Sequence, residues 1–366
     1  MDAKAAYDEF LASLASAAEL ITGPNGAVDD RERAEGFRHL TRLTSIALEM
    51  IVEKGDPAHP ELTRWMNPHR KMMGDNPGTI YESAWLDPSL HYVLRGNRGG
   101  TTWIGVCIYG TGEGGSRRIA GAIDSEVEYS ADGSFELHLA ASRPSDLPAG
   151  ASFLALEPDA TDLLIRQYFH DPSAQAEATY SIEVVGGGAP PALSESVFAD
   201  RLVAAGRYVR DVLEVETTIS AISQTTAPPE IRKPGSTAGE GEVDWSVINR
   251  VQPTPAIGYS GAWFDDLDDD EVIVAQGVLP ACDYASVQWL SRWMESGDYA
   301  HHQVQLTDRQ MRLAADRSFA VSLSRSDPED GTAWLDTTGI RHGTFVIRTL
   351  GAEPAEVTYR RYKREQ

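Results

Sequence analysis

The second half of this chain repeats the first half. Residues 132–139 (DGSFELHL) reappear as residues 316–323 (DRSFAVSL), and each copy then passes through a turn rich in proline and aspartate. Each copy closes on an apolar run that ends in arginine, at Arg166 in the first half and Arg348 in the second. Because residue order, residue type and spacing are preserved together, the repeat predicts two copies of one fold unit.

The residue pattern within each copy is typical of β structure. Short apolar runs separated by glycine, asparagine, aspartate and proline fill residues 81–185 and return from residue 245 onward. Many short strands joined by turns are typical of antiparallel sandwiches and jelly rolls. Apolar residues at helical spacing predict helices over residues 3–21 and 29–51, and Ser194 is a candidate N-cap for another helix.

We therefore predict a mainly β fold of the α+β class. It consists of two tandem antiparallel β-sandwich or jelly-roll domains with an N-terminal α-hairpin and a linking helix. A chain of 366 residues exceeds the size at which one core keeps growing, which also favours two domains. The predicted order is a helical region over 1–75, a first sandwich over 76–190, a linking helix and loop over 191–250, and a second sandwich over 251–366.

The acidic composition restricts the partners of the protein. The formal net charge is −23, from 55 acidic and 32 basic residues. Such a field repels phosphate backbones and anionic lipid head groups, so we expect neither nucleic acid nor a membrane as a partner. A small molecule is the expected ligand, and association into a homo-oligomer stays open.

Two further features bear on location. No basic segment followed by an apolar one stands near Met1, and no apolar run reaches membrane-spanning length. Cys107 and Cys282 both lie in apolar, strand-like runs, where a thiol usually behaves as a small buried hydrophobe. Two cysteines make neither a disulfide framework nor a zinc site. We predict a cytoplasmic location.

Two stretches of the chain resemble known bacterial families. Residues 76–87 (NPGTIYESAWLD) resemble the stretch that opens the first β-domain of the domain-of-unknown-function 1254 proteins. Residues 283–289, 327–328 and 334–337, together with Arg348, resemble the partner family, domain of unknown function 1214. The resemblance implies two β-sandwich domains and, in some members, export as a lipoprotein. It implies no established reaction.

An acidic run over residues 264–271 (FDDLDDDE) is a candidate metal site. Its carboxylates suit a hard cation such as Mg²⁺ or Ca²⁺. Asp265, Asp266 and Asp269 also form the Asp-Asp-x-x-Asp arrangement that class I terpene cyclases use on a helix to bind magnesium diphosphate. Strand-like runs flank this segment, however, so a solvated turn between strands is the alternative.

The local context argues against two other motifs. Residues 110–115 fit G-x-G-x-x-G after a strand, but a dinucleotide site needs a following helix, and residues 119–129 predict a strand. We therefore expect a hairpin tip there. Residues 258–261 lack the spacing of a serine-hydrolase elbow.

Polar and aromatic residues at the ends of predicted elements form the candidate site. Tyr81, His301 and Asp336 are the candidates for proton transfer. Arginine at a strand end can bind a carboxylate through paired N–H donors. The candidate ligand-binding residues are Asn76, Arg95, Tyr284, Trp334 and Arg348.

The arginines that end the repeated runs have a structural alternative. Arg166 and Arg348 recur at the same place in both copies, so they could cap each sandwich by pairing with Asp87 or Asp336. We favour this structural role because it explains the recurrence.

Three functions fit these residues. The favoured one is an enzyme that acts by hydrolysis or elimination on a small, partly apolar metabolite in the cleft between the sandwiches. The alternative is a non-catalytic module that binds a ligand or carbohydrate, which exposed and coplanar Trp263, Trp289 and Trp293 would support. A magnesium-dependent cyclase or lyase that uses the acidic run is the third.

Overall fold

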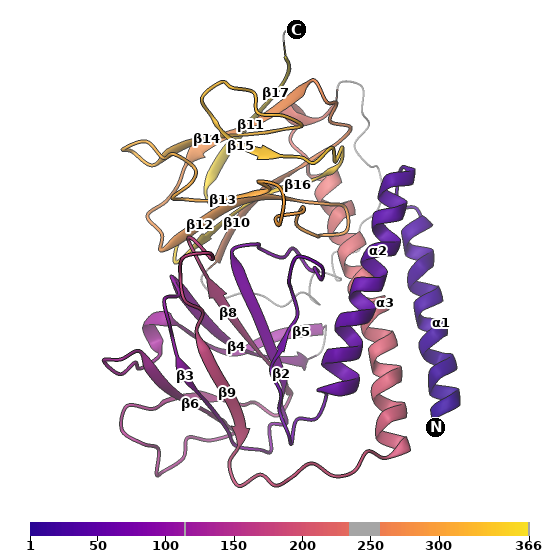
Figure 1. Ribbon diagram of the computed structural model, residues 1–366, viewed down its shortest axis with the longest axis vertical. Helices are drawn as coiled ribbons and strands as arrows, with labels where there is room; N and C mark the ends of the chain where they lie inside the picture. Colours follow the sequence, from indigo (N-terminus) through magenta and orange to yellow (C-terminus); the bar gives the residue numbers. More distant parts are fainter. Residues whose placement is uncertain (113–114, 234–256, 365–366) are drawn as a thin grey trace.

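Two β-sandwiches stand one above the other, with three α-helices along one side (Figure 1). The computed structural model of the protein describes residues 1–112, 115–233 and 257–364. The architecture is mainly β, with four sheets and three α-helices in the described residues. The α+β class with two tandem sandwiches, predicted from the sequence, is confirmed.

The three helices begin at side-chain caps. The cap residues Asp2, Asp29 and Ser194 each accept a hydrogen bond from a backbone N–H of the first turn, which satisfies a donor that has no intrahelical partner. A π-helix, η1 (Leu48–Glu53), continues the second helix. The α-helices are α1 (Ala3–Thr22), α2 (Asp30–Ala47) and α3 (Glu195–Thr225), and the 3₁₀ turns are η2 (Asp124–Glu126) and η3 (Pro229–Ile231).

The first sandwich consists of a five-stranded and a four-stranded sheet. The larger sheet runs in the order β1 (Thr63–Arg64), β2 (Thr79–Trp85), β8 (Ala160–Tyr168), β4 (Trp103–Gly112) and β5 (Gly115–Ile123). The smaller runs in the order β7 (Ser152–Ala155), β6 (Ser134–Ala140), β3 (Tyr92–Asn97) and β9 (Thr179–Val184). Strands β4 and β5 pair as an antiparallel hairpin, as expected for the glycine-rich motif, whose residues 113–114 lie outside the described residues.

The second sandwich consists of two four-stranded sheets. One runs in the order β10 (Ile257–Phe264), β16 (Gly343–Leu350), β12 (Tyr284–Leu290) and β13 (Gln305–Thr307). The other runs in the order β15 (Ala333–Asp336), β14 (Ser318–Ser324), β11 (Glu271–Val278) and β17 (Glu356–Lys363).

Both sandwiches have the same strand order once the short β1 is set aside. Strands β2, β8, β4 and β5 correspond in turn to β10, β16, β12 and β13, and β7, β6, β3 and β9 to β15, β14, β11 and β17. Each smaller sheet contains one parallel pair, β6 with β7 and β14 with β15. The repeated arginines also face equivalent residues, because Arg166 pairs with Tyr81 across β8 and β2, and Arg348 pairs with Tyr259 across β16 and β10.

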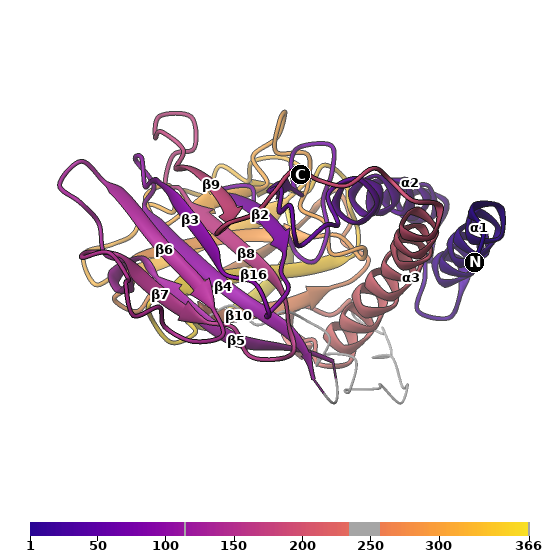
Figure 2. The same ribbon diagram turned by 90° about the horizontal axis from the view of Figure 1, so that it is seen from below.

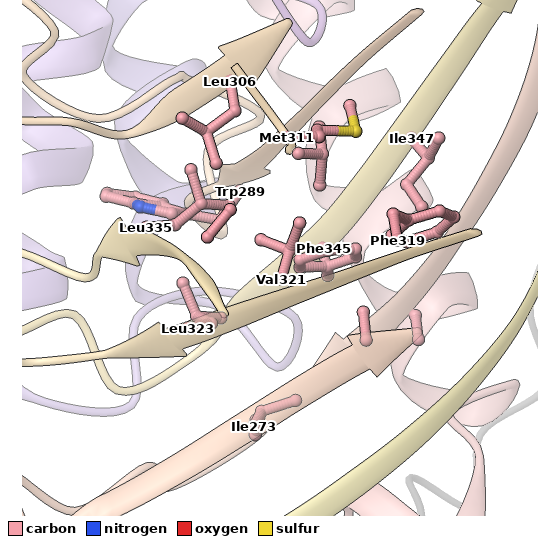
Figure 3. Packing of buried hydrophobic residues seen from close by; sticks show 14 of the residues in the cluster. Ile273, Trp289, Leu306, Met311, Phe319, Val321, Leu323, Leu335, Phe345 and Ile347 are labelled. Atoms are coloured by element: carbon pink, nitrogen blue, oxygen red, sulfur yellow. The ribbon is translucent and has the colours of Figure 1, made fainter. Parts of the chain in front are cut away.

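Each sandwich encloses its own apolar core. Side chains alternate along a strand, so Leu163 and Ile165 of β8 point into the first core while Leu164 points out toward the helices. The second core is built in the same way, and Figure 3 shows Val321 of β14 and Phe345 of β16 within it. Burying one such side chain stabilises the fold by about 1.5–3 kcal/mol.

The helices cover the outer face of the larger first sheet. Tyr81, Cys107, Tyr109 and Leu164 of that sheet share an apolar cluster with residues of all three helices. Figure 2 shows the three helices gathered on one side of the sheets. A smaller cluster of Trp103, Tyr168, Tyr284 and Leu350 joins the two sandwiches directly. No helix among the described residues is long and apolar enough to span a bilayer.

The loop predicted to follow the linking helix, up to residue 250, lies outside the described residues from residue 234 onward. Its first residues belong to the end of α3 and to η3.

Candidate functional site

A pocket of about 460 Å³ lies where the two sandwiches and α3 meet, and we call it the interdomain pocket. Its volume is in the range of small-molecule sites in proteins. The lining residues are Trp65, Met66, Met72, Met73, Gly74, Tyr81, Trp85, Gly110, Thr111, Thr161, Asp162, Leu164, Arg166, Tyr168, Tyr208, Asp211, Val212, Val215, Tyr259 and Arg348.

Strand alternation explains why polar groups reach this pocket. On β8, the side chains of Leu164, Arg166 and Tyr168 point away from the first sandwich core and line the pocket. On β16, Phe345 and Ile347 fill the second core, and Arg348 lies on the opposite face of the strand. The repeated β unit therefore presents one arginine from each sandwich to the same space.

Both arginines are buried. Arg166 is 5% exposed, and its Nη1 donates to the hydroxyl of Tyr109 at 3.0 Å. Arg348 is 4% exposed and donates to Oε1 of Gln288 at 2.6 Å and to the carbonyl of Gly74. Neither forms an ion pair with a carboxylate of the described residues. A guanidinium stays charged, so the pocket contains two cations.

Tyr81 places a protonated phenol in the pocket. Its side chain is 8% exposed, and its hydroxyl oxygen accepts a hydrogen bond from the backbone N–H of Asn76 at 3.3 Å. Burial raises the pKa of Tyr81 to about 12, against the opposing influence of Arg348. The phenol is therefore neutral at physiological pH, and its proton has no acceptor among the described residues.

Aromatic and aliphatic side chains form most of the rest of the wall, together with Thr111, Thr161, Asp162 and Asp211. Trp65 and Trp85 lie on the side of the first sandwich, and Met72 precedes it in the chain. From α3 come Tyr208 and Val212, and the hydroxyl of Tyr208 donates to the sulfur of Met72 at 3.7 Å. Burial raises the pKa of Tyr208, so it too stays neutral. An apolar wall around a polar head is typical of a ligand site.

The backbone turn at Met73 and Gly74 fixes Arg348. Both residues have positive φ, 51° and 71°, a conformation that a side chain such as that of Met73 adopts rarely. Hydrogen bonds hold the turn in place. The N–H of Met73 donates to Glu216 at 2.6 Å, and the N–H of Gly74 donates to the carbonyl of Met294 at 2.7 Å.

A cluster of buried charges anchors the helices next to the pocket, and we call it the seam cluster. It consists of His39, Arg42, Glu216 and Glu295. The Nε2 of His39 lies 2.6 Å from Glu216, its Nδ1 lies 2.9 Å from Glu295, and Arg42 donates to Glu295 at 2.7 Å. Burial opposes protonation, but the two carboxylates outweigh it and raise the pKa of His39 to about 10. The cluster thus joins α2, α3 and the second sandwich.

Two of the predicted site residues line the pocket, and two lie beside it. Tyr81 and Arg348 are in the wall. Asn76 and Tyr284 lie in the contact between the sandwiches instead, where the amide of Asn76 donates to Ser286 at 3.1 Å and to the hydroxyl of Tyr284 at 3.4 Å. These two side chains join the domains and do not line the pocket.

The other four candidates lie outside the pocket. Arg95 is on the outer face of β3, where it pairs with Glu136 at 2.6 Å and with Glu183. His301 pairs with Asp298 at 3.0 Å, and its side chain is 73% exposed. Asp336 pairs with His302 at 2.8 Å, and the indole of Trp334 donates to the carbonyl of Ser324 at 3.2 Å. None of them shares a pocket wall with Tyr81.

The predicted pairing of Arg166 and Arg348 with Asp87 or Asp336 was wrong. Asp87 accepts hydrogen bonds from the backbone and hydroxyl of Ser89, and Asp336 binds His302. Arg166 and Arg348 point to the opposite side of their strands and bind neither carboxylate. Both arginines lie on equivalent strands of the two sandwiches, and both guanidinium groups line the pocket.

The acidic run forms a turn between β10 and β11, and its carboxylates bind cations of the chain itself. Lys233 donates to Asp266 at 2.5 Å, and Arg341 also binds Asp266. These hydrogen bonds lower the pKa of Asp266 to about 2. Asp265 accepts from the N–H of Lys233 at 3.1 Å, and Asp269 is exposed.

This arrangement does not fit Mg²⁺ or Ca²⁺. Over the described ranges, no three His, Cys, Asp or Glu side chains are grouped so that they could hold a metal ion. The strands on either side also lack the helical context of the cyclase motif. We therefore derive no chemistry from the turn.

The tryptophans expected to form an exposed platform are buried. Trp263, Trp289 and Trp293 are each at most 3% exposed and belong to the apolar interior. The feature that would have supported a carbohydrate-binding surface is therefore not present at these three residues.

Sequence reasoning missed most of the pocket wall. In the sequence, Arg166 stands out only because it recurs as Arg348. The same recurrence is the signal that assigns Arg166 to the site of Arg348. Trp65 and Met72 lie in the connection between β1 and β2, and Tyr208 lies in α3. These residues carry no motif, so only the packing of α3 brings them together.

A larger hollow of about 1150 Å³ lies at one end of the second sandwich. Its charged lining residues Arg312, Asp330 and Glu356 are all exposed to solvent. Charges in water bind a ligand weakly in comparison with buried ones, so the interdomain pocket is the stronger candidate.

The chain is similar to two solved structures. An uncharacterised protein from Burkholderia cenocepacia is 28% identical, with 98% of this chain and 96% of that chain covered and a TM-score of 0.85. A protein from Vibrio parahaemolyticus is 12% identical, with coverage of 96% and 100% and a TM-score of 0.50, and it shares the fold alone. No protein-family model and no curated protein matches the chain. The resemblance to the two families of unknown function stays a prediction.

Proposed function

We propose that the protein is an enzyme that acts on a small, partly apolar metabolite in the interdomain pocket, by hydrolysis or elimination. The observation that supports this most directly is the phenol of Tyr81, which burial keeps protonated in an apolar pocket beside Arg348. In both reactions a bond to a leaving group breaks and the leaving group takes a proton. Tyr81 would donate that proton, and Arg348 would stabilise the phenolate that remains.

Binding without turnover is the second candidate, and one feature of the pocket favours it. The described lining includes no histidine, cysteine, serine or lysine, the side chains that most often act as nucleophile or base. Water would then have to be the nucleophile in hydrolysis, and Asp162 or Asp211, the carboxylates of the wall, would take the proton from that water or, in elimination, from the substrate.

A cytoplasmic location without nucleic acid partners belongs to the same proposal. The net charge of −23 disfavours phosphate backbones, and both cysteines are unpaired, which suits a reducing compartment.

The test compares wild type with Tyr81→Phe on the small-molecule extract of bacterial cells. Mass spectrometry follows which compounds bind the protein and which it consumes. We expect wild type to consume at least one bound compound, and the variant to bind it but consume it about 10²–10⁴-fold more slowly, because a general acid is lost.

Tyr180→Phe is the matched control. The hydroxyl of Tyr180 binds Glu82 and Gln167 outside the pocket, so its removal should leave consumption unchanged. Equal turnover by wild type and Tyr81→Phe would refute the catalytic role of Tyr81. A compound that binds wild type and is never consumed would establish the non-catalytic alternative.

A further inference from the structure

We infer that the ligand of the interdomain pocket is an aryl- or alkyl-carboxylic acid, whose carboxylate lies between the guanidinium groups of Arg166 and Arg348. The inference rests on the proposed function and deepens it by naming the chemical class of the ligand. Its basis is the difference between these two arginines and the other buried arginines of the described chain.

The other buried arginines have carboxylate partners. Arg42 pairs with Glu295 at 2.7 Å, Arg292 pairs with Glu32 at 2.7 Å, and Arg361 binds Glu271 at 2.5 Å. Arg166 and Arg348 are as deeply buried and have no such partner in the part of the chain that the structure describes. A buried charge without a partner is strongly unfavourable, so an anion from outside the chain is the missing partner.

The two guanidinium groups face the same place. Both line the pocket, and both are close enough to Tyr81 and Tyr168 to influence the ionisation of those phenols. The hydroxyl of Tyr168 has no hydrogen-bond partner among the described residues. An anion at this point would therefore meet two cations and two phenolic O–H donors.

The two arginines keep free N–H donors for a carboxylate. Arg348 already donates through Nη1 to Gln288 and through Nη2 to Gly74, and Arg166 donates through Nη1 to Tyr109. Because each Nη carries two N–H groups, the donors that remain are the Nε–H of both arginines, the Nη2 group of Arg166 and one N–H on each Nη of Arg348. Paired N–H donors of a guanidinium bind the two oxygens of a planar carboxylate through parallel hydrogen bonds.

The rest of the ligand is apolar. Apolar side chains, among them Trp65, Trp85, Leu164, Met72 and Val212, make up much of the wall, which also contains the carboxylates Asp162 and Asp211. Thioether side chains adapt to ligand shape, and aromatic rings pack against flat or aliphatic groups. A carboxylic acid with an aromatic or medium-length aliphatic body satisfies both ends of the pocket.

The experiment titrates the full-length protein with three probes of similar size and follows tryptophan fluorescence, because Trp65 and Trp85 line the pocket. The probes are 3-phenylpropionate, its neutral amide and 2-phenylethylphosphonate. We expect the carboxylate to bind best. Arg166→Met and Arg348→Met should each weaken carboxylate binding about 10- to 100-fold, because a charged hydrogen bond is lost, and leave amide binding unchanged.

Arg95→Met is the matched control, since Arg95 is exposed and bound to Glu136. Arg166→Lys and Arg348→Lys keep the charge, and they serve if a methionine variant does not fold. Amide binding as tight as carboxylate binding, tighter binding of the phosphonate, or an unchanged affinity in the arginine variants would overturn the inference.

The two proposals fail separately. Consumption of a neutral metabolite from the cell extract together with no preference for the carboxylate would refute the ligand class and leave catalysis standing. Carboxylate binding that depends on both arginines, without consumption of any compound, would refute catalysis and leave the ligand class standing.

Discussion

The two sandwiches share a strand order and a Tyr–Arg pair, yet they hold their arginines differently. Arg166 is held within its own sandwich by Tyr109 and lies 3.7 Å from the sulfur of Cys107. At the equivalent place in β12, Gln288 binds Arg348 and also donates to the backbone carbonyl of Asp75 at 2.7 Å. The second arginine is thus tied to the segment that leads into the first sandwich. One copy of the unit holds its cation locally, and the other uses its cation to join the domains.

The two sandwiches also differ in what covers the outward face of each. The helices cover the first sandwich. In the second sandwich the corresponding face receives the segment around Gly74 and Asp75, where Asp75 accepts hydrogen bonds from the N–H and hydroxyl of Ser296 at 2.8 and 2.6 Å. Two sandwiches with the same strand order therefore leave two outward faces to be buried, and here the interdomain pocket lies between the two coverings.

Removing the centre of the seam cluster should have the largest effect on stability. His39→Leu leaves Glu216 and Glu295 without the cation between them, so the free energy of unfolding should fall by about 3–5 kcal/mol. Urea denaturation at neutral pH measures it. Arg38→Ala, an exposed change one residue away, should stay within about 0.5 kcal/mol of wild type. A loss for His39→Leu no larger than that would show that the cluster does not anchor the helices.

Equivalent core positions should respond equally. Leu139 of β6 and Leu323 of β14 occupy the same place in the repeat, and both are 0% exposed. Leu139→Ala and Leu323→Ala should each lower the free energy of unfolding by about 2–5 kcal/mol, and the two losses should be similar. Denaturation of the two variants side by side checks this. A large loss in only one of them would mean that the shared strand order does not extend to shared packing.

The stability of the seam cluster should also depend on pH. The pKa of His39 rises from 6.5 to about 10 on folding, so its contribution is complete below pH 6.5 and is lost as pH rises toward 10. Between pH 7 and pH 9 the free energy of unfolding should fall by about 2 kcal/mol from this group alone. Denaturation at both pH values tests it. His39→Leu removes the titrating group, so an equal fall in that variant would assign the pH dependence elsewhere.

Much of the fold follows from local signals in the sequence. The caps Asp2, Asp29 and Ser194 and the apolar spacing behind them predict the three helices, and alternating short runs predict the two sandwiches. Strand alternation could also have excluded Arg95, because its neighbour Leu94 fills the first core and Arg95 must then face solvent.

The site was less predictable because it depends on which outer faces are covered. Tyr81 and Arg348 were identified from their positions at strand ends, and both line the pocket. His301 and Asp336 also lie near strand ends, but at an exposed corner of the second sandwich. A sequence shows where strands end. It does not show that α3 packs beside both sandwiches and encloses one group of these ends.

The most direct test of the central claim is a crystal structure of the protein soaked with 3-phenylpropionate. The account predicts that the carboxylate lies within hydrogen-bond distance of both Arg166 and Arg348, with the ring against Trp65 and Trp85. A carboxylate bound to only one sandwich, or elsewhere on the molecule, would contradict the claim that the two copies of the β unit form one binding site.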